Sequence, residues 1–531
     1  MIRKIAIRNY RMFRKFDLEF SPGINILVGR NDTGKSTLIE AINLALTGRV
    51  HGRVLAQELS PYHINLDATR EYVQNLQSGN HAAPPEMIID LFLEHADQTE
   101  ILRGTNNVDG ENTCGVRIQA KLSQDFYEEY KSFIGETGVV RLAPTEYYKV
   151  DWLGFSGNAV SLRSVPATAS VIDPTTIRLQ SGVDYHLQEI IRTHLEPRER
   201  VELSRQYRSL REEFSEKEAV KAINEQLQTD DDNLTERKLS LAIDISQRYT
   251  WESSLVAHLD DLPFQFIGKG DQNALKTLLA IGRRANDTHV ILIEEPETHL
   301  SHTSLRKLIS RIEDRCADKQ LIIATHSNYV LNKLGLRNLV LLGDGAATRI
   351  TDVPEDTVDY FKKLAGFDTL RLVLADGAIL VEGPSDELVI QRGYKDANGK
   401  LPIEDGIDVI SVGLSHKRFL DLAIRLHRRV WIVTDNDGKS LEQVRKRFSD
   451  YLESEFVSLH TGNNPNLKTL EPHIVAANDL ATLNVTLGTQ CGSKEEVLDA
   501  MLKDKTGSAL KILESETKIE MPDYIRDVYR E

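Results

Sequence analysis

Residues 29–36, with the sequence GRNDTGKS, form the first motif in the chain whose side chains could carry chemistry. They match GxxxxGK[ST] at every fixed position, between a strand-like apolar run (24–28) and a helix-like one (38–46). In that setting the glycines let successive backbone N–H groups turn toward phosphate oxygens at a helix N-terminus. We expect Lys35 to reach the β- and γ-phosphates of a bound ATP and Ser36 to ligate Mg²⁺.

A second motif, VILIEEPE at residues 290–297, ends an apolar run on carboxylates. Four apolar residues followed by an acid are typical of a buried strand that delivers the acid to a metal. Glu294 is the candidate Mg²⁺ ligand, directly or through water. Glu295, one residue further on, is the candidate catalytic group that polarises the attacking water.

Two shorter segments fit the same site. Residues 321–327, LIIATHS, predict another buried strand with His326 at its polar end, where an imidazole can sense a γ-phosphate. The alternative is a histidine that only caps the strand. Residues 268–272, GKGDQ, precede a helical pattern, and a glycine-rich helix start is an anion site that in a dimer can reach the partner's ATP.

A second acidic site is predicted further along the chain. Residues 378–386, AILVEGPSD, and residues 430–437, VWIVTDND, each run from an apolar strand pattern into acids. Neighbouring parallel strands present their carboxyl ends together, which would gather Glu382, Asp386, Asp435 and Asp437 into one pocket. Four like charges need cations, and oxygen-only ligands favour Mg²⁺ or Mn²⁺. Such a site suits phosphodiester hydrolysis, with one metal activating water and another stabilising the leaving oxygen.

The helical patterns between these motifs have a different character. Residues 186–245 are rich in charge, and apolar or aromatic residues recur at helical spacing at Leu203, Tyr207, Leu210 and Phe214. The sequence DDDN at 230–233 interrupts this pattern. The segment is either a self-association hairpin or a helix pair that packs on its own domain, and the spacing leaves both open.

Composition bounds the class of protein. The 531 residues are 40% apolar and 27% charged, enough for several packed domains. The net charge of −15 argues against a surface coated with phosphate-binding charge, although a local basic group between His416 and Arg429 is dense. The alternative for that group is an ordinary solvated helix face.

Other classes are excluded by simpler features. The apolar runs are too short to span a bilayer and no signal-peptide pattern opens the chain, so we expect a cytoplasmic protein without membrane association. The three cysteines, Cys114, Cys316 and Cys491, show no CxxC spacing, so neither a structural zinc site nor a disulfide framework is expected.

Together the nucleotide motifs resemble the ABC-type ATPases of the SMC and RecF class, and Ile7–Phe13 looks like their usual opening segment. In that class two heads sandwich ATP. The resemblance implies that Gly270 and Gln272 contact the partner's nucleotide, although GKGDQ departs from the usual Ser-Gly-Gly/Gln signature. The remaining nucleotide contacts expected within the chain are Arg11, Asn31, Gly34 and Thr37.

The second acidic site resembles the Toprim domain of primases, topoisomerases and certain nucleases. An ABC-type ATPase followed by a Toprim domain resembles the OLD (overcoming lysogenization defect) nucleases, a family that includes the nuclease component of the Gabija antiphage system. LKTLE at 467–471 looks like a later acidic motif of that family and implies Glu471 as a metal ligand. MLKDKT at 501–506 looks like its lysine motif, with Lys505 stabilising the scissile phosphate and Lys503 as a close rival.

The expected fold class is α/β, an ABC-type P-loop ATPase with a helical dimerisation insert followed by a Toprim domain. The expected boundaries are 1–185 and 246–370 for the two ATPase parts, 186–245 for the insert and 371–531 for the Toprim domain.

The leading hypothesis is an ATPase that regulates a metal-dependent DNA endonuclease in antiphage defence, with Glu382 and Asp386 as catalytic acids. One alternative is an SMC/RecF-like clamp that binds DNA without cutting. Another is the effector subunit of a larger complex with a helicase-like protein, or with a reverse transcriptase and its noncoding RNA. A topoisomerase or primase is disfavoured because no motif singles out a tyrosine nucleophile or a template-binding module. We expect a homodimer or higher homo-oligomer.

Overall fold

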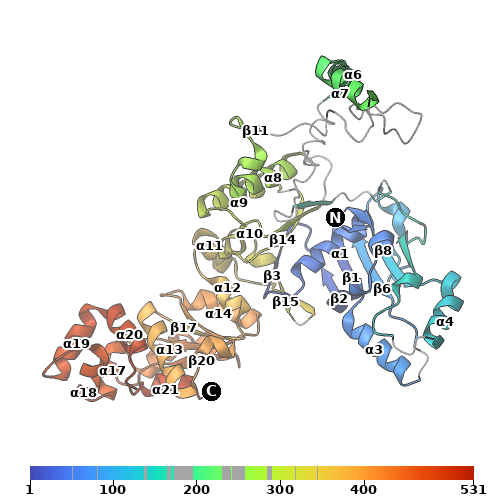
Figure 1. Cartoon of the computed structure of the whole chain (residues 1–531). Coiled ribbons are helices and arrows are strands. Elements are labelled where there is room, and N and C mark those ends of the chain that lie inside the picture. The colour runs from blue at the N-terminus through green and yellow to red at the C-terminus, as the bar shows by residue number, and fades with distance from the viewer. Residues whose placement is uncertain are drawn as a thin grey trace. The chain divides into compact units, whose positions relative to one another are not determined.

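The structure is a computed structural model of the whole chain (Figure 1). It describes residues 1–50, 52–79, 82–136, 140–162, 164–165, 169–172, 195–229, 241, 251, 258–283, 290–316, 318–343 and 345–530. The chain divides into two compact units. The first consists of residues 1–166 together with 320–531, and the second of residues 167–319. The predicted domain boundaries at 185 and 245, and the interruption at 230–233, lie outside the described residues.

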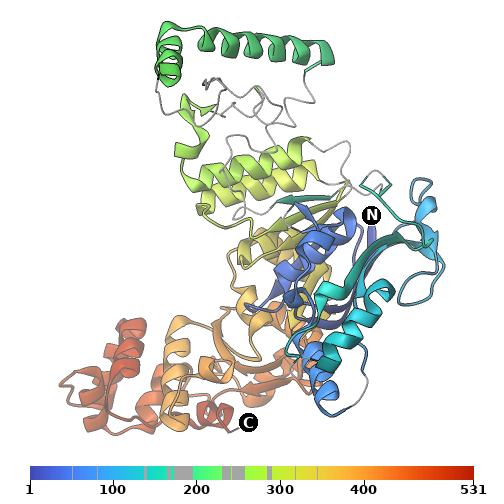
Figure 2. The ribbon, with the colours of Figure 1, turned by 45° about the vertical axis from the view of Figure 1, so that its right-hand side comes forward.

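An antiparallel sheet of the first unit begins at the N-terminus. Its strand order is β2 (Phe13–Glu19), β1 (Ile2–Tyr10), β6 (Met87–Leu93), β8 (Thr113–Leu122) and β7 (Arg103–Gly104), and β9 (Tyr148–Gly154) also pairs with β8. In β2, Phe16 and Leu18 are buried while Lys15, Asp17 and Glu19 are exposed, and this alternation places one face against the core and one in water. Figure 2 shows these strands side by side.

The P-loop of the same unit follows a buried parallel strand. β3 (Ile24–Gly29) lies between β14 (Gln320–Ala324) and β15 (Leu339–Gly343), both parallel to it, and β16 (Ala346–Arg349) closes the edge antiparallel to β15. α1 (Lys35–Thr47) is preceded by the capping residue Gly34 and followed by the capping residue Gly48. Both glycines have positive φ, which suits helix ends. α10 (Asn328–Leu334) follows β14.

The residues from Gly377 to Val528, which we call the Toprim region after the expectation from sequence, have their own four-stranded parallel sheet. The order is β18 (Ile407–Ser411), β17 (Gly377–Val381), β19 (Arg429–Val433) and β20 (Val457–His460), with α13 (Pro384–Asn398), α14 (His416–Arg425) and α15 (Leu441–Arg447) in the connections. β17 is buried along its whole length. The prediction that the two acidic motifs end neighbouring parallel strands is confirmed by the pairing of β17 with β19.

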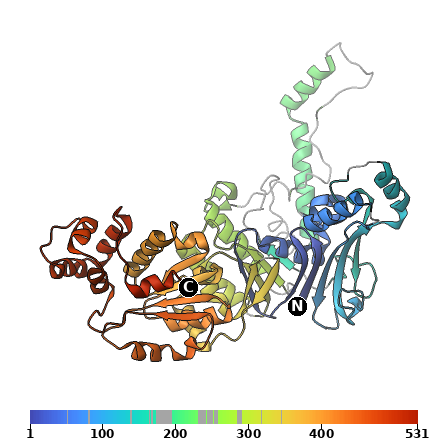
Figure 3. The same ribbon diagram turned by 90° about the horizontal axis from the view of Figure 1, so that it is seen from below.

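Short helices complete this region at the C-terminal end of the sequence. They are α17 (Leu470–Ala477), α18 (Leu480–Leu487), α19 (Lys494–Lys503), α20 (Lys505–Glu514) and α21 (Asp523–Val528), drawn in red tones in Figure 3. Ile474, Val497, Met501 and Ile512 from these helices share one apolar core with Ile379 of β17. This core holds Glu471 and Lys505, at the starts of α17 and α20, on the Toprim scaffold.

Two further helices join the P-loop region to the Toprim sheet within the first unit. They are α11 (Glu355–Lys363) and α12 (Thr369–Leu374). Three side chains of the basic group between His416 and Arg429 are paired or buried within the protein. Arg418 pairs with Asp356, Arg425 donates to the Asp352 carbonyl at 2.6 Å, and His416 is buried. These side chains hold α14 against the preceding segment, whereas Lys417 and His427 of the same group are exposed, so the candidate patch stays a prediction.

The second unit contains the 290–294 strand and the helical segment. β10 (Ala169–Ile172) pairs in parallel with β13 (Val290–Glu294), and α8 (Lys269–Arg283) and α9 (His302–Arg315) belong to the same unit. α6 (Pro197–Ser215) and α7 (Glu218–Thr229) follow one another, in green in Figure 2. Within the described residues, no helix has the length and apolar character needed to cross a membrane.

Candidate nucleotide and metal sites

The loop that follows β3 closes tightly around its own lysine. Lys35 Nζ donates to the carbonyl oxygens of Gly29 and Arg30, both at 2.9 Å, and the lysine is buried. Thr33 Oγ1 donates to the Arg30 carbonyl at 2.9 Å. A Cβ at Gly29 would lie 2.7 Å from the backbone oxygen of Leu342, so the first glycine of the motif is required by packing. Residues 30–35 therefore form a compact loop at the start of α1.

The second glycine of the motif meets the N-terminal hairpin. Gly34 has φ 94°, and a Cβ there would lie 2.5 Å from the Phe13 ring and 2.6 Å from Met12 Sδ. Ser36 is exposed at the start of α1, as its predicted role as a Mg²⁺ ligand requires. Arg11, a predicted nucleotide contact, pairs with Glu40 of α1 at 2.9 Å. Asn31 is exposed and Thr37 is half-buried.

Arg30 and His326 lie at the same end of the parallel strands, because β14 and β3 are neighbours. Both residues line a cavity of about 810 Å³ whose far wall is the start of the Toprim region, including Leu374, Asp376 and Glu404. Arg30 donates to the Leu374 carbonyl at 3.1 Å and pairs with Asp376 at 2.9 Å. The P-loop is thus tied to the residue that precedes β17.

The second unit carries the two acids of the 290–297 motif. Glu294 ends β13, and Glu295 has a φ of 40°, which is strained for a residue with a side chain and is typical of functional positions. Thr298 Oγ1 donates to Glu295 Oε2 at 3.1 Å and fixes that carboxylate. The strand-end placement expected for both acids is present within this unit.

Gly270 and Gln272 stand at the start of α8 and make contacts inside their own unit. A Cβ at Gly270 would lie 2.5 Å from the His299 carbonyl oxygen, and the Gln272 amide donates to the carbonyls of Phe264 and Ile267 at 2.9 and 2.8 Å. These contacts give both residues a packing role. Their predicted contact with a partner's nucleotide stays a prediction.

The Toprim acids meet at the carboxyl ends of β17 and β19. Glu382 follows β17, Asp386 stands in the first turn of α13, and Asp435 follows β19. The buried Thr434 donates its hydroxyl to Glu382, and the Gly383 N–H donates to Asp386 Oδ2 at 2.9 Å. Glu382 and Asp386 are therefore each oriented by a neighbouring donor.

Glu471 and Lys505 join this group from the C-terminal helices. Glu471 is buried and accepts a hydrogen bond from Thr469 at 2.7 Å, and Lys505 Nζ lies 3.1 Å from both of its carboxylate oxygens. Lys503, the rival of Lys505, is exposed at the end of α19. The geometry therefore favours Lys505 for the predicted role.

The carboxylates strongly disfavour one another's charge. Burial, together with the neighbouring carboxylates of Glu382 and Glu471, raises the pKa of Asp386 to about 6. Burial likewise raises the pKa of Asp435 to about 8, with contributions from Asp386, Glu382 and Glu471. A desolvated set of oxygen donors with these pKa values fits divalent cations, which would compensate the gathered negative charge.

Asp437 differs from the other predicted ligands. Its carboxylate is half exposed and lies 3.5 Å from Lys439 Nζ. Asp437 N–H donates to the Lys468 carbonyl at 3.2 Å, and its φ is 52°. The loop holds Asp437 beyond Asp435 at the rim, and its role as a metal ligand stays a prediction.

Sequence inspection missed two residues that organise this site. Thr434 precedes the DND motif, and its hydroxyl bond to Glu382 has no sequence signature. Asn436 lies between the two aspartates, is 1% exposed, and donates to the carbonyls of Gly462, Asn464 and Leu467 at 2.9–3.1 Å. The polar residue between the two aspartates was the signal available in the sequence. The three carbonyl oxygens that accept its hydrogen bonds, however, lie on a loop distant in sequence.

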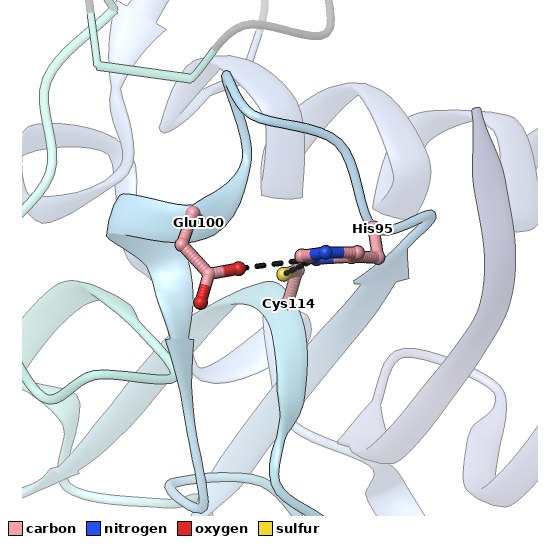
Figure 4. Close-up of side chains that lie close together, drawn as sticks. All are labelled: His95, Glu100 and Cys114. Carbon is pink, nitrogen blue, oxygen red and sulfur yellow. Dashed lines mark hydrogen bonds and ion pairs between the residues drawn. The ribbon is translucent and has the colours of Figure 1, made fainter.

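A separate group of metal-ligand side chains lies on the antiparallel sheet. Among the described residues, His95, Glu100 and Cys114 are the group whose ligand atoms all lie within 4.8 Å of one another (Figure 4). His95 Nδ1 is 3.0 Å from Glu100 Oε2 and 3.8 Å from Cys114 Sγ. His95 and Glu100 are exposed, and their ion pair explains the contact. The described Toprim acids are spaced more widely than this group.

Comparisons with known families agree with these two sites. A family model for an AAA domain matches residues 4–255. A second AAA-domain model, whose description also names the AbiEii toxin of a type IV TA system, matches residues 252–332. The model of the Toprim domain of overcoming-lysogenization-defect-like proteins matches residues 373–437. The chain is thus an ATPase of α/β fold with a C-terminal OLD-like Toprim domain. This domain order is the architecture of the OLD family.

Curated relatives match over short stretches. The DNA replication and repair protein RecF of Vibrio vulnificus (strain YJ016) is 31% identical over 124 residues, which cover 19% of this chain and 34% of RecF. The DNA double-strand break repair Rad50 ATPase of Methanopyrus kandleri is 49% identical over 49 residues, 9% of this chain and 6% of Rad50. The chain therefore spans about a third or less of the length of these relatives.

Solved structures show low similarity. An SMC head bound to the C-terminal winged-helix domain of ScpA has a TM-score of 0.34 and 14% identity, covering 66% of this chain and 97% of that one. The recombination mediator RecF with ATP has a TM-score of 0.33 and 12% identity, with coverage of 66% and 97%.

Proposed function

We propose that this protein is an ATP-regulated, divalent-metal-dependent DNA endonuclease. The observation that carries the proposal is the Toprim acidic site, where Glu382, Asp386, Asp435 and Glu471 are gathered with Lys505. A domain that only binds nucleic acid has no need for several mutually repelling, desolvated carboxylates. Hydrolysis of a phosphodiester needs such a set to hold cations.

The site residues divide the work by their positions. Glu382, Asp386, Asp435 and Glu471 would hold Mg²⁺ or Mn²⁺, with Asp437 available at the rim. A bound cation would polarise the phosphate and lower the pKa of an attacking water. Thr434 and the Gly383 N–H fix the orientation of Glu382 and Asp386. Lys505, half-exposed beside Glu471, is placed to stabilise charge that develops on the scissile phosphate.

ATP acts as a regulator in this proposal. The P-loop binds the nucleotide, Ser36 ligates its Mg²⁺ and His326 senses the γ-phosphate. Glu294 and Glu295, which belong to the second unit, keep the roles of Mg²⁺ ligand and water-polarising group that the sequence predicts. The Arg30–Asp376 ion pair gives the P-loop a direct contact with the residue before β17, from which Glu382 emerges. Nucleotide binding can therefore alter the Toprim site through a short path.

A nucleotide-controlled DNA clamp that does not cut is the second candidate. It is favoured by the partial matches to RecF and Rad50, whose names place them in DNA replication and repair. This candidate predicts that DNA binding responds to ATP, while substitution of the Toprim acids leaves function intact.

The biological setting is an extension of the same proposal. OLD-like architecture favours a role in antiphage defence, alone or with a helicase-like or reverse-transcriptase partner. Exposed apolar side chains on α6, including Leu210 and Phe214, support self-association through the helical segment.

The test is cleavage of supercoiled plasmid by the purified protein with Mg²⁺ or Mn²⁺, with and without ATP. Nicking or linearisation that needs the metal is the expected result. Lys35→Ala, which cannot hold the triphosphate, and Glu295→Gln, which holds it without turnover, then show whether binding or hydrolysis controls cutting. ATP turnover without cleavage under every condition would contradict the nuclease and favour the clamp.

A further inference from the structure

A pocket lies beside the Toprim acidic site, where β20 ends. Its volume is about 690 Å³, and its walls include Thr461, Asn464, His473, Arg445 and Tyr524. β20 is parallel to β19, and the Thr434 N–H donates to the His460 carbonyl at 3.2 Å. Asp435 and Thr461 therefore leave neighbouring strands at the same edge of the sheet. The pocket and the acidic site are adjacent.

Asn436 fastens the pocket wall to the metal-binding loop. Its amide nitrogen donates to Gly462, Asn464 and Leu467, so the loop after β20 is fixed relative to the neighbouring Asp435. Tyr524 is a second residue that links the pocket to the acidic site. It lines the pocket, and burial together with the Asp435, Asp386 and Glu471 carboxylates raises the pKa of its phenol.

The pocket contains buried polar atoms that lack partners. Thr461 is 4% exposed, and its Oγ1 has no hydrogen-bond partner among the described residues. Arg526 Nε, also in the pocket wall, is buried without a partner there. An unpaired buried polar group costs about 1–3 kcal/mol, so a ligand in this pocket that bonds to these two atoms would recover that cost.

The charges of the pocket indicate the kind of group that fits. Arg526 is already paired with Glu520 and Asp523, and burial lowers the pKa of His473, which keeps the imidazole neutral near pH 7. Arg445 is the other arginine of the wall. The lining also carries the carboxylates of Glu520, Asp523 and Asp527, so it has no excess of positive charge for a phosphate. It offers hydroxyl and amide groups, and the His473 and Tyr524 rings with centroids 5.2 Å apart. A neutral, planar group with donors and acceptors matches this lining.

We propose that this pocket binds one unpaired nucleobase of the nucleic-acid strand whose phosphate occupies the acidic site. The orientation of the strand rests on the proposed nuclease function. A base can enter such a pocket only when it is unstacked from a duplex, so the pocket selects single-stranded or locally opened DNA. Thr461 contacts the base, and Asn436 is a positioning residue that holds the wall.

The test compares Thr461→Val with Thr486→Val. Thr486 is a matched control, because it is 6% exposed and its hydroxyl also lacks a partner, but it lies on α18 outside the pocket. The probe is a single-stranded oligonucleotide with 2-aminopurine at successive positions. Its fluorescence and binding are measured with Ca²⁺ in place of Mg²⁺, so that the readout does not depend on cleavage.

We expect one 2-aminopurine position to change its fluorescence on binding, and Thr461→Val to weaken binding about five- to tenfold while Thr486→Val does not. An abasic residue at the responsive position should weaken binding by the wild-type protein. It should weaken binding by Thr461→Val much less, because that variant has already lost the contact with the base. Equal binding of both variants, or no responsive position, would overturn the pocket even if the protein cuts DNA. A Thr461-dependent signal in a protein that does not cut would preserve the pocket and reject the nuclease.

Discussion

Lys505 Nζ lies 3.1 Å from the carboxylate of Glu471, a buried side chain that reaches the Toprim acids from another helix. The pair places one positive charge at the edge of a strongly acidic site. Lys503, two residues earlier, ends α19 in an exposed position.

Replacement of the two lysines should separate their roles. Lys505→Ala removes a cation from the phosphate position and should lower the cleavage rate about 10²- to 10³-fold. Lys503→Ala is the matched control and should cut at the wild-type rate. Rates are measured by single-turnover plasmid nicking. Equal losses in both variants, or a loss in Lys503→Ala alone, would reverse the assignment.

The pH dependence of the metal-free protein should report Asp435. Its pKa rises from an ordinary 3.8 to about 8 on folding, so the folded state binds the proton more tightly. The resulting stability is fully present below pH 3.8 and is lost as the pH rises to about 8, with a slope of at most about 1.4 kcal/mol per pH unit. Asp435→Asn should flatten this part of the stability curve, measured by urea unfolding in chelator.

Metal binding should release protons for the same reason. At pH 7, Asp435 holds a proton that a Mg²⁺ or Mn²⁺ ion must displace. Calorimetric titration in two buffers of different ionisation enthalpy should therefore show proton release that shrinks above pH 8. Binding without proton release at pH 7 would contradict the raised pKa of this carboxyl.

The Arg30–Asp376 pair should couple nucleotide to cleavage. Asp376→Ala removes the ion pair between the P-loop and the residue before β17 without touching either set of acids. We expect ATP turnover to persist while the response of cleavage to ATP shrinks severalfold. Arg53→Ala, which breaks another exposed ion pair with Glu58, should leave the response unchanged. An unaltered response in Asp376→Ala would show that coupling runs elsewhere.

Self-association should depend on α6. Leu210 is 65% exposed and Phe214 52% exposed on this helix. Leu210→Glu should shift the molecular mass measured by light scattering toward the monomer, because a charge opposes burial of the apolar stripe. Leu262→Glu, at an exposed apolar residue outside α6, controls for surface charge. Unchanged mass in Leu210→Glu would place the interface away from this helix.

The sequence predicted the scaffold well wherever an apolar strand ended on a chemical group. The sequence placed these groups at or just after strand ends, because buried parallel strands have a clear pattern and their ends are polar: Gly29–Ser36, Glu294, His326, Glu382 and Asp435. Placement of Glu471 and Lys505 came from family resemblance. Their approach to the acids depends on packing of the C-terminal helices, which local sequence does not encode.

Side-chain partnerships were the part that sequence could not predict. The basic group on α14 looked free, yet Arg418 and Arg425 are committed to residues more than sixty positions earlier. Asn436 and Thr434 acquire their roles only through hydrogen bonds across the sheet. Such contacts depend on which elements become neighbours in three dimensions.

The most direct test of the central claim compares Asp386→Asn with Glu387→Gln in metal-dependent plasmid cleavage. The two acids are adjacent on α13, but Asp386 faces the other Toprim carboxylates while Glu387 pairs with Arg371 at 3.1 Å. We predict that Asp386→Asn loses cleavage and keeps ATP turnover, and that Glu387→Gln keeps both. Undiminished cleavage by Asp386→Asn would contradict a nuclease centred on the Toprim acids.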